Sequence, residues 1–225
     1  MSKAKPIKSR TRILIVDDHP MMRQGLAALI NNEKDLTVCC EAESAAQAMD
    51  AIAANKPDLV IADITLPDKS GLELIKDTLA LHPGLRILVV SMHDESLYAE
   101  RVLRAGGRGY IMKQEGGKRL MDGIRQVLAG QIYVSEKMSK RILEIFSGQR
   151  NSSGGSPVEK LTDREFEVFQ LVGEGKGTRE IAEKLHLSVK TVEVHRLHIK
   201  EKLEIKTAAE LIRFAVRWVE TQAPS

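Results

Sequence analysis

Five short aliphatic runs alternate with amphipathic segments along the first 130 residues of the chain. The aliphatic runs are predicted β-strands, and they fall at residues 13–16, 36–40, 59–62, 87–90 and 110–112. Apolar residues at helical spacing follow each run, at 20–31, 44–54, 70–81, 95–105 and 116–129. Because parallel strands need long crossover connections, this alternation favours a parallel sheet covered by helices on both faces. We therefore expect a five-stranded, doubly wound α/β domain.

The pattern changes after Gly130. Residues 135–146 predict one more helix, and the Gly-, Ser- and Asn-rich run at 147–157 is typical of a flexible linker. Four helical segments follow from Leu161 onward without a strand pattern, so the second domain is expected to be all-α. Capping-box spacing marks four helix starts, at Ser44 with Gln47, Ser70 with Glu73, Thr162 with Glu165 and Thr207 with Glu210. The predicted organisation is a basic tail, an α/β domain, a linker and a helical domain, at residues 1–10, 11–130, 131–158 and 159–225.

Composition limits where the chain works. It has no apolar stretch of about 18 residues, and the basic residues up to Arg12 precede no apolar core of a secretory signal. We expect a soluble, cytoplasmic protein with no membrane partner. Cys39 and Cys40 are the only cysteines, and adjacent side chains on a strand point to opposite faces. Neither a mutual disulfide nor a shared metal ion is expected for this pair.

Polar side chains follow four of the predicted strands. Ligands of open parallel sheets bind outside the carboxyl ends of the strands, which are the positions of Asp17, Asp18, Asp63, Ser91 and Lys113. If these ends converge, three carboxylates share one pocket, where like charges ~4 Å apart repel by roughly 4 kcal/mol per pair. A bound Mg²⁺ would neutralise them, since it prefers oxygen ligands. Taken alone, an Asp pair before a helix is more often a cap, but the joint placement favours a ligand site.

Four segments resemble the receiver domain of bacterial two-component response regulators, which has a flavodoxin-like fold. They are "LIVDDHP" at 14–20, "DLVIADITLPDKSGLEL" at 58–74, "ILVVSMHD" at 87–94 and "AGGRGYIMK" at 105–113. The resemblance implies that Asp63 accepts a phosphoryl group from a sensor histidine kinase. It also implies that Mg²⁺ is held by Asp17, Asp18, Asp63 and the backbone carbonyl of Thr65. Lys113 would pair with the phosphoryl group and Ser91 would donate a hydrogen bond to it.

The same resemblance predicts how a signal leaves this pocket. Ser91 is expected to move toward the phosphoryl group while Tyr110 turns inward, although Tyr110 as a simple core aromatic is nearly as good an interpretation. Thr65 and His93 each lie two residues beyond a site residue, Asp63 or Ser91. We expect these two side chains, with Met92, to control the approach of water and hence the lifetime of the phosphoryl group.

Two short helices in the second domain have helix-turn-helix spacing. They are predicted at 178–185 and 189–203 and are joined by "HLS". At 100° per residue, the second helix places an apolar stripe on its inner side, formed by Val192, Ile199 and Leu203. The opposite side carries Lys190, Glu193, Val194, Leu197, His198 and Glu201, while Arg196 and Lys200 flank the stripe.

The segment 161–218 resembles the LuxR-type DNA-binding domain through "LTDRE", "EIAEKL", "TVEVH" and "KL", so the whole chain resembles a response regulator of the NarL/FixJ class. The resemblance implies contacts with double-stranded promoter DNA by Lys190, Thr191, Glu193, Val194, Arg196, Leu197 and Lys200. Glu193, Val194 and Leu197 depart from family members with basic residues there, which leaves the target sequence open. A protein-interaction module is the alternative, because residues 151–225 hold 12 basic and 12 acidic residues. Residues 190–206 hold 5 basic and 3 acidic residues, which favours DNA.

The expected function is a phosphorylation-regulated transcription regulator rather than an enzyme. The last helix, at 208–220, carries an apolar stripe formed by Leu211, Ala215 and Trp218, which core packing explains in part. In the family that the chain resembles, this helix also pairs two DNA-binding domains. We therefore expect a homodimer on phosphorylation. Two further alternatives stay open. One is a constitutive DNA-binding regulator whose receiver does not switch, and the other is a Mg²⁺-dependent phosphohydrolase that uses Asp63 as its nucleophile.

Overall fold

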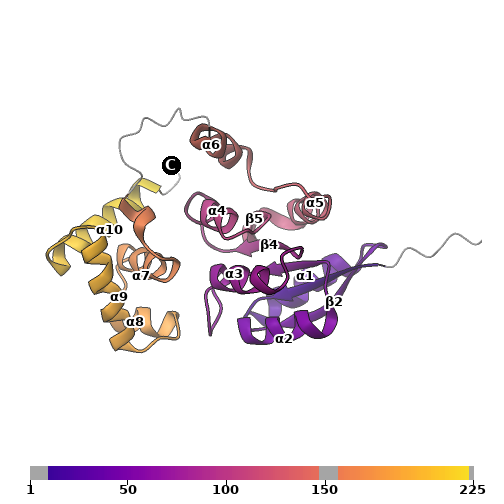
Figure 1. Ribbon diagram of the computed structural model, residues 1–225, viewed down its shortest axis with the longest axis horizontal. Coiled ribbons are helices and arrows are strands. Elements are labelled where there is room, and N and C mark those ends of the chain that lie inside the picture. Colours follow the sequence, from indigo (N-terminus) through magenta and orange to yellow (C-terminus); the bar gives the residue numbers. More distant parts are fainter. Residues whose placement is uncertain (1–9, 147–156, 223–225) are drawn as a thin grey trace, which may run out of the picture. The chain divides into compact units, whose positions relative to one another are not determined.

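The computed structural model describes residues 10–146 and 157–222 (Figure 1). The chain divides into two compact units, one up to Ser135 and one from Glu136 onward. The predicted N-terminal tail lies outside the described residues except for Arg10, and the predicted Gly/Ser-rich run at 147–157 lies outside them except for Pro157.

The first unit is built on a five-stranded parallel sheet in the order β2-β1-β3-β4-β5. Its strands are β1 (Thr11–Val16), β2 (Leu36–Ala42), β3 (Leu59–Ala62), β4 (Arg86–Ser91) and β5 (Gly109–Met112). The helices between and after them are α1 (Pro20–Asn31), α2 (Ala45–Asn55), α3 (Gly71–Leu81), α4 (Glu95–Arg104) and α5 (Gly116–Leu128). The predicted doubly wound fold is confirmed, with element ends shifted by two residues or fewer.

The strands read as continuous apolar runs because helices cover both faces of the sheet. Ile13 and Ile15 of β1 belong to one buried cluster with residues of α1 and α5, which are Leu26, Ile30, Leu120, Ile124 and Val127. Leu14 and Val16 alternate with them along the strand and are equally buried, so they point to the opposite face. Figure 1 shows the helices on both sides of the strands.

The helix starts follow the predicted caps with one exception. Ser70 and Glu73 form the expected capping box at α3. Ser44 caps α2 by accepting from the N–H of Gln47, but the side chain of Gln47 accepts from the N–H of Glu43 rather than from that of Ser44. The prediction of a reciprocal box was wrong there, because Gln47 reaches one residue further back.

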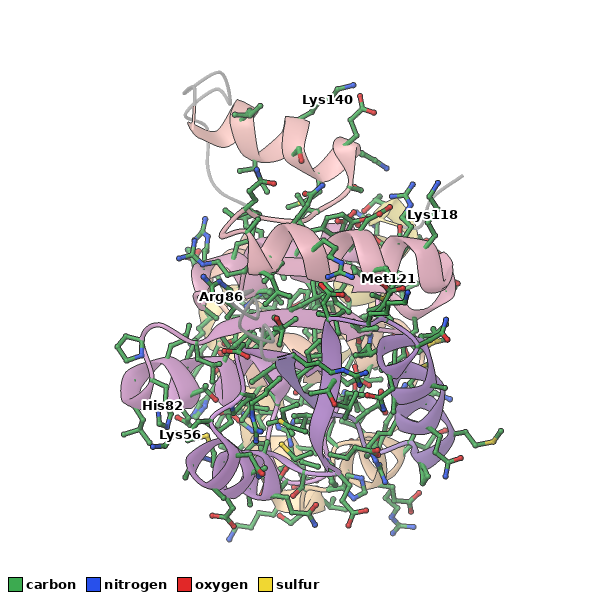
Figure 2. All side chains as sticks on the ribbon, turned by 90° about the vertical axis from the view of Figure 1, so that its right-hand side faces the viewer. Lys56, His82, Arg86, Lys118, Met121 and Lys140 are labelled. Atoms are coloured by element: carbon green, nitrogen blue, oxygen red, sulfur yellow. The ribbon has the colours of Figure 1, made fainter. Side chains whose placement is uncertain are left out.

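The helices α2 and α3 run back along the sheet, so their last residues lie away from the carboxyl ends of the strands. Lys56 ends α2 in the left-handed conformation with φ 48°, and His82 ends α3. Figure 2 shows Lys56 and His82 on the same outer side of the first unit. The loops that carry the polar residues therefore lie at the opposite end of the strands, their carboxyl ends.

Strand β2 contains a bulge that the sequence did not predict. Val38 pairs with Ile13 and Cys40 pairs with Leu14, so Cys39 is an extra residue with no partner on β1. The sulfur atoms of Cys39 and Cys40 lie 3.2 Å apart. The expectation that these side chains point to opposite faces was wrong, because the bulge interrupts the alternation on which it rested.

The second unit contains helices joined by short turns, and no strand, in its described residues, 136–146 and 157–222. Its helices are α6 (Glu136–Phe146), α7 (Asp163–Gly173), α8 (Thr178–Lys184), α9 (Val189–Lys202) and α10 (Ala208–Gln222). Trp218 of α10 packs edge-on against Phe166 and Phe169 of α7, at 5.6 and 5.5 Å between ring centroids. Leu211 and Ala215 are fully buried, so the predicted stripe on the last helix is core. None of the described helices is long and apolar enough to cross a membrane.

Candidate functional site

Two buried aspartates lie at the carboxyl ends of neighbouring strands. Asp17 follows β1 and Asp63 follows β3, and the backbone N–H of Asp63 donates to the carbonyl of Val16 at 2.9 Å. The N–H of Asp17 donates in turn to Ala42 of β2. Both side chains are nearly inaccessible, with 2% and 4% of their surface exposed. The sheet register therefore brings together two carboxylates that are 46 residues apart in the sequence.

Lys113 joins the two carboxylates. It follows β5, and its Nζ lies 2.7 Å from Oδ2 of Asp17 and 2.6 Å from Oδ2 of Asp63. Burial alone would lower the pKa of Lys113, but the negative charge of Asp63 and the hydrogen bonds to both aspartates outweigh it and raise the pKa. The ammonium therefore stays charged at neutral pH and compensates one of the negative charges.

The pocket retains unbalanced negative charge beside Asp18. One ligand atom each from Asp17, Asp18, His19 and Asp63 lies within 4.8 Å of the others. Oδ1 of Asp18 is buried and accepts no hydrogen bond from the described residues; Nδ1 of His19 lies 2.6 Å away but lacks hydrogen-bond alignment. Opposite ligands of an octahedral Mg²⁺ lie about 4 Å apart, so this cluster of acidic oxygens fits such an ion.

His19 is a pocket residue that sequence reasoning missed. Its N–H donates to Oδ1 of Asp17 at 2.9 Å, and its Nδ1 lies 3.2 Å from the same oxygen. The imidazole itself is largely exposed, at 66%. Its position directly after the Asp pair in "VDDHP" was the available signal.

The predicted switch residues form one connected group beside the pocket. Ser91 is buried at the end of β4, and its Oγ accepts from the N–H of His93 at 3.5 Å. The hydroxyl of Tyr110 donates to the carbonyl of His93 at 2.8 Å. Burial raises the pKa of Tyr110 well above its usual range despite a hydrogen bond with Ser91. Tyr110 thus already points inward, with 1% of its surface exposed.

The predicted water-controlling residues behave differently from one another. Oγ1 of Thr65 lies 3.0 Å from Nε2 of His93, and the His93 ring packs against Tyr98 with centroids 4.8 Å apart. Met92 is 68% exposed. Thr65 and His93 are therefore fixed across the loop beside Asp63, whereas Met92 points toward solvent.

Helix α9 has the expected buried and open sides, except that Leu203 of the predicted stripe caps the helix and is only half-buried. Val192 and Ile199 are fully buried, while Val194 and Leu197 are 42% and 48% exposed. Residues of both charges share the open side with them, namely Lys190, Glu193, His198 and Glu201. The apolar pair on a solvent-facing side is therefore available for contact with a partner.

Two other predicted DNA contacts also organise the helix-turn-helix. Thr191 donates its N–H to Oγ of Ser188, the N-cap of α9, at 3.0 Å. Nη1 of Arg196 donates to Oγ1 of Thr178 at the start of α8 at 2.9 Å. Thr191 thus fixes the first turn of α9, and Arg196 ties the two helices of the motif together.

A partly buried ion pair that sequence reasoning missed holds the far end of α9. Nζ of Lys202 lies 2.6 Å from Oε2 of Glu165 on α7, and the same carboxylate accepts from the N–H of Thr162 at 2.8 Å. Glu165 is 3% exposed. Burial would raise the pKa of Glu165, but these hydrogen bonds and the charge of Lys202 outweigh it and lower the pKa.

We expect Glu165→Gln to destabilise the helical domain by about 1–2 kcal/mol at pH 7, because it removes a charged hydrogen-bond acceptor. The folded pKa lies below the ordinary 4.5, so this contribution is present above that value and disappears as pH falls through the folded pKa. Urea unfolding followed by fluorescence of Trp218, the only tryptophan, measures this domain alone. Glu201→Gln on the exposed side of α9 is the matched control; an equal loss in both variants at pH 7 would contradict the assignment.

Comparison with known proteins identifies the family. Residues 13–125 match the response regulator receiver domain, and residues 159–215 match the bacterial regulatory proteins of the luxR family. The chain therefore belongs to the two-component response regulators that carry a LuxR-type helix-turn-helix. It is a DNA-binding transcription regulator and not an enzyme, so the phosphohydrolase and protein-interaction alternatives are set aside.

Individual relatives match along nearly the whole chain. The chain is 35% identical over 210 residues to the oxygen regulatory protein NreC of Staphylococcus carnosus, which covers 92% of this chain and 97% of NreC. RcsB from Salmonella enterica serovar Typhimurium, bound to promoter rprA with the phosphomimetic BeF₃⁻, is 25% identical over 92% of this chain and 99% of RcsB, with a TM-score of 0.62. A structure of two RcsB dimers bound to two parallel DNAs is also 25% identical, over 92% and 98%, with a TM-score of 0.57.

Proposed function

We propose that this response regulator accepts a phosphoryl group on Asp63 from a sensor histidine kinase and thereby controls its binding to promoter DNA. The observation that carries the proposal is the buried Asp63, whose carboxylate pairs with Lys113, and Lys113 pairs with Asp17 as well. The receiver would comprise residues 11–130 and the DNA-binding domain residues 159–225, joined by a linker at 131–158, and the protein would act in the cytoplasm.

In the transfer, an oxygen of Asp63 attacks phosphorus while the bond from phosphorus to the kinase imidazole breaks. Lys113 shifts from the two carboxylates to the phosphoryl oxygens, and the hydroxyl of Ser91 donates to another of them. Asp17, Asp18, Asp63 and the backbone carbonyl of Thr65 would hold Mg²⁺, which offsets the negative charge of carboxylates and phosphoryl group together. The buried, unsatisfied Oδ1 of Asp18 supports this assignment.

The signal would leave through the hydrogen bonds around His93. Ser91 accepts from the N–H of His93, and Tyr110 donates to its carbonyl. A shift of Ser91 toward the phosphoryl group would therefore disturb the loop that leads into α4. Because Tyr110 is already inward, we propose that phosphorylation stabilises this orientation rather than creating it.

The output would be a dimer that contacts two half-sites through α9. Val194 and Leu197 can contact thymine methyl groups, and Glu193 can accept from a cytosine amino group. Lys190 would face the major groove with them, Arg196 and Lys200 would contact phosphates, and Thr191 would contact the DNA beside them. Since Leu211 and Ala215 are core residues, dimer pairing on α10 would use its outward side, where Ile212 is 43% exposed. The dimeric, DNA-bound state of RcsB supports this arrangement.

The proposal is tested by mixing full-length protein with fragmented genomic DNA and Mg²⁺, with and without a small-molecule phosphodonor, and sequencing what is retained. We expect a shared two-fold symmetric site to be enriched at least about 10-fold by the donor, because phosphorylation favours the dimer that binds both half-sites. Asp63→Asn should abolish this donor effect, while Asp77→Asn, which removes a half-exposed carboxylate on α3 that pairs with Lys69, should preserve it.

A second variant separates DNA binding from phosphorylation. Lys190→Glu places a negative charge on the open side of α9 and should abolish DNA retention with or without the donor, while Asp63 is still phosphorylated. Equal enrichment with and without donor in the parent protein would instead establish the constitutive regulator with a non-switching receiver.

A further inference from the structure

The two cysteines of the chain form a close pair on the edge strand of the receiver. Cys39 is the extra residue of the β2 bulge, and its Sγ lies 3.2 Å from Sγ of Cys40. Both residues are partly exposed, so small molecules reach them. The strand continues to Ala42, whose carbonyl accepts from the N–H of Asp17, so the thiol pair lies in the strand that helps to position the acidic pocket.

The geometry disfavours a disulfide between these neighbours. Adjacent α-carbons are about 3.8 Å apart, whereas disulfides usually join α-carbons about 4.4–6.8 Å apart. The sulfurs would also have to approach from 3.2 Å to about 2.05 Å. Burial and the hydrogen bond with Cys39 raise the pKa of Cys40 to about 12, so this residue is a thiol at neutral pH and any centre that binds its sulfur must displace the proton.

The same geometry suits a shared thiophilic centre. Two sulfurs bound tetrahedrally at about 2.3 Å from a zinc ion lie ~3.8 Å apart, which is closer to the observed separation than a disulfide is. A pyramidal centre such as trivalent arsenic has a narrower S–As–S angle, which brings the sulfurs nearer still. Zinc needs further protein ligands besides two sulfurs. Among the described residues, the group of three or more potential metal ligands is Asp17, Asp18, His19 and Asp63, which does not include the cysteines. The cysteine pair therefore does not suit zinc. Two thiolates suffice for a trivalent arsenical that carries one organic substituent.

We propose that Cys39 and Cys40 form a two-sulfur chelating site for trivalent metalloids of the arsenic type. In the binding reaction with an arylarsine oxide, two As–S bonds form, two S–H bonds and the As–O bonding break, and one water molecule leaves. Arsenic stays trivalent and both sulfurs keep their oxidation state, so no oxidant or reductant is needed. The bulge is what creates the site, because regular strand alternation would separate the two side chains.

The test uses full-length, reduced protein titrated with phenylarsine oxide and followed by intact-mass spectrometry and thiol counting. We expect one phenylarsenic group per chain, added with loss of one water and both free thiols. A small dithiol should remove the group, whereas a monothiol at the same thiol concentration should not. Cys39→Ser and Cys40→Ser should each weaken binding by about 100-fold or more, because each leaves a single sulfur without the chelate effect.

Two results would overturn the proposal. One is wild-type protein that takes up no arsenical, or that releases it equally to monothiol and dithiol. The other is a single-serine variant that binds as tightly as wild type, which would mean that the thiols act independently. The competition experiment on wild-type protein decides the question even if a variant folds poorly.

Discussion

Gly71→Ala is expected to lower the free energy of unfolding of the receiver by about 3 kcal/mol or more. A β-carbon at Gly71 would lie 2.1 Å from the carbonyl oxygen of Asp63 and 2.8 Å from the α-carbon of Ile64. Both are backbone atoms, and they cannot move aside as a side chain does. The N–H of Gly71 also donates to the carbonyl of Ile64 at 2.7 Å, so separating the segments breaks that bond. The residue that would be displaced is Asp63, the proposed phosphoacceptor. The rate of phosphorylation by a small phosphodonor should therefore fall together with the stability of the receiver.

Gly25→Ala is the matched control within the same domain. Gly25 lies inside α1, and its added β-carbon would meet no atom within 4 Å. Alanine is favoured over glycine inside a helix by about 0.5–1 kcal/mol, so this variant should be slightly more stable than the parent. Urea unfolding by circular dichroism reports both domains, and Trp218 fluorescence separates the second. A Gly71→Ala receiver as stable as Gly25→Ala would show that the loop relaxes freely.

Lys113→Met is expected to destabilise the receiver by about 3 kcal/mol, because it breaks a buried ion pair. We expect a value at the lower end of the usual range for such pairs, since the pocket opens at the surface end of the strands. The side chain of Lys113 is 3% exposed, and its removal leaves the buried carboxylates of Asp17 and Asp63 without their cation. Lys118→Met, on the exposed side of α5, removes the same charge without this contact and should change stability by less than about 0.5 kcal/mol. Figure 2 labels Lys118 on the outside of the receiver.

Magnesium should separate the two lysine variants. If Asp17, Asp18 and Asp63 hold the ion, Mg²⁺ takes over part of the charge compensation that Lys113→Met removes. The gain in unfolding free energy from adding Mg²⁺ in place of a chelator should then be larger in Lys113→Met than in Lys118→Met. An identical gain in both would count against a metal site at these carboxylates.

The sequence predicted the pocket because its geometry follows from strand order alone. Asp17 and Asp63 had to meet once β1 and β3 were neighbours, and Lys113 had to join them from the end of β5. Contacts between distant elements could not be predicted in the same way. Glu165 and Lys202 are 37 residues apart on different helices, and no periodic pattern links them. The bulge at Cys39 also escaped, because a register shift has no necessary sequence signal when neither glycine nor proline marks it.

The separation of buried and exposed residues on α9 has an evolutionary consequence. Val192 and Ile199 hold the helix in the domain, whereas Val194 and Leu197 face outward and contribute little to its core. With the DNA contacts proposed for α9, substitutions at the outward positions change which operator is bound while leaving folding nearly untouched. On the proposed function, descendants of one ancestral regulator acquire new target genes in this way through a few point mutations, while the receiver still accepts its phosphoryl group from the same kinase.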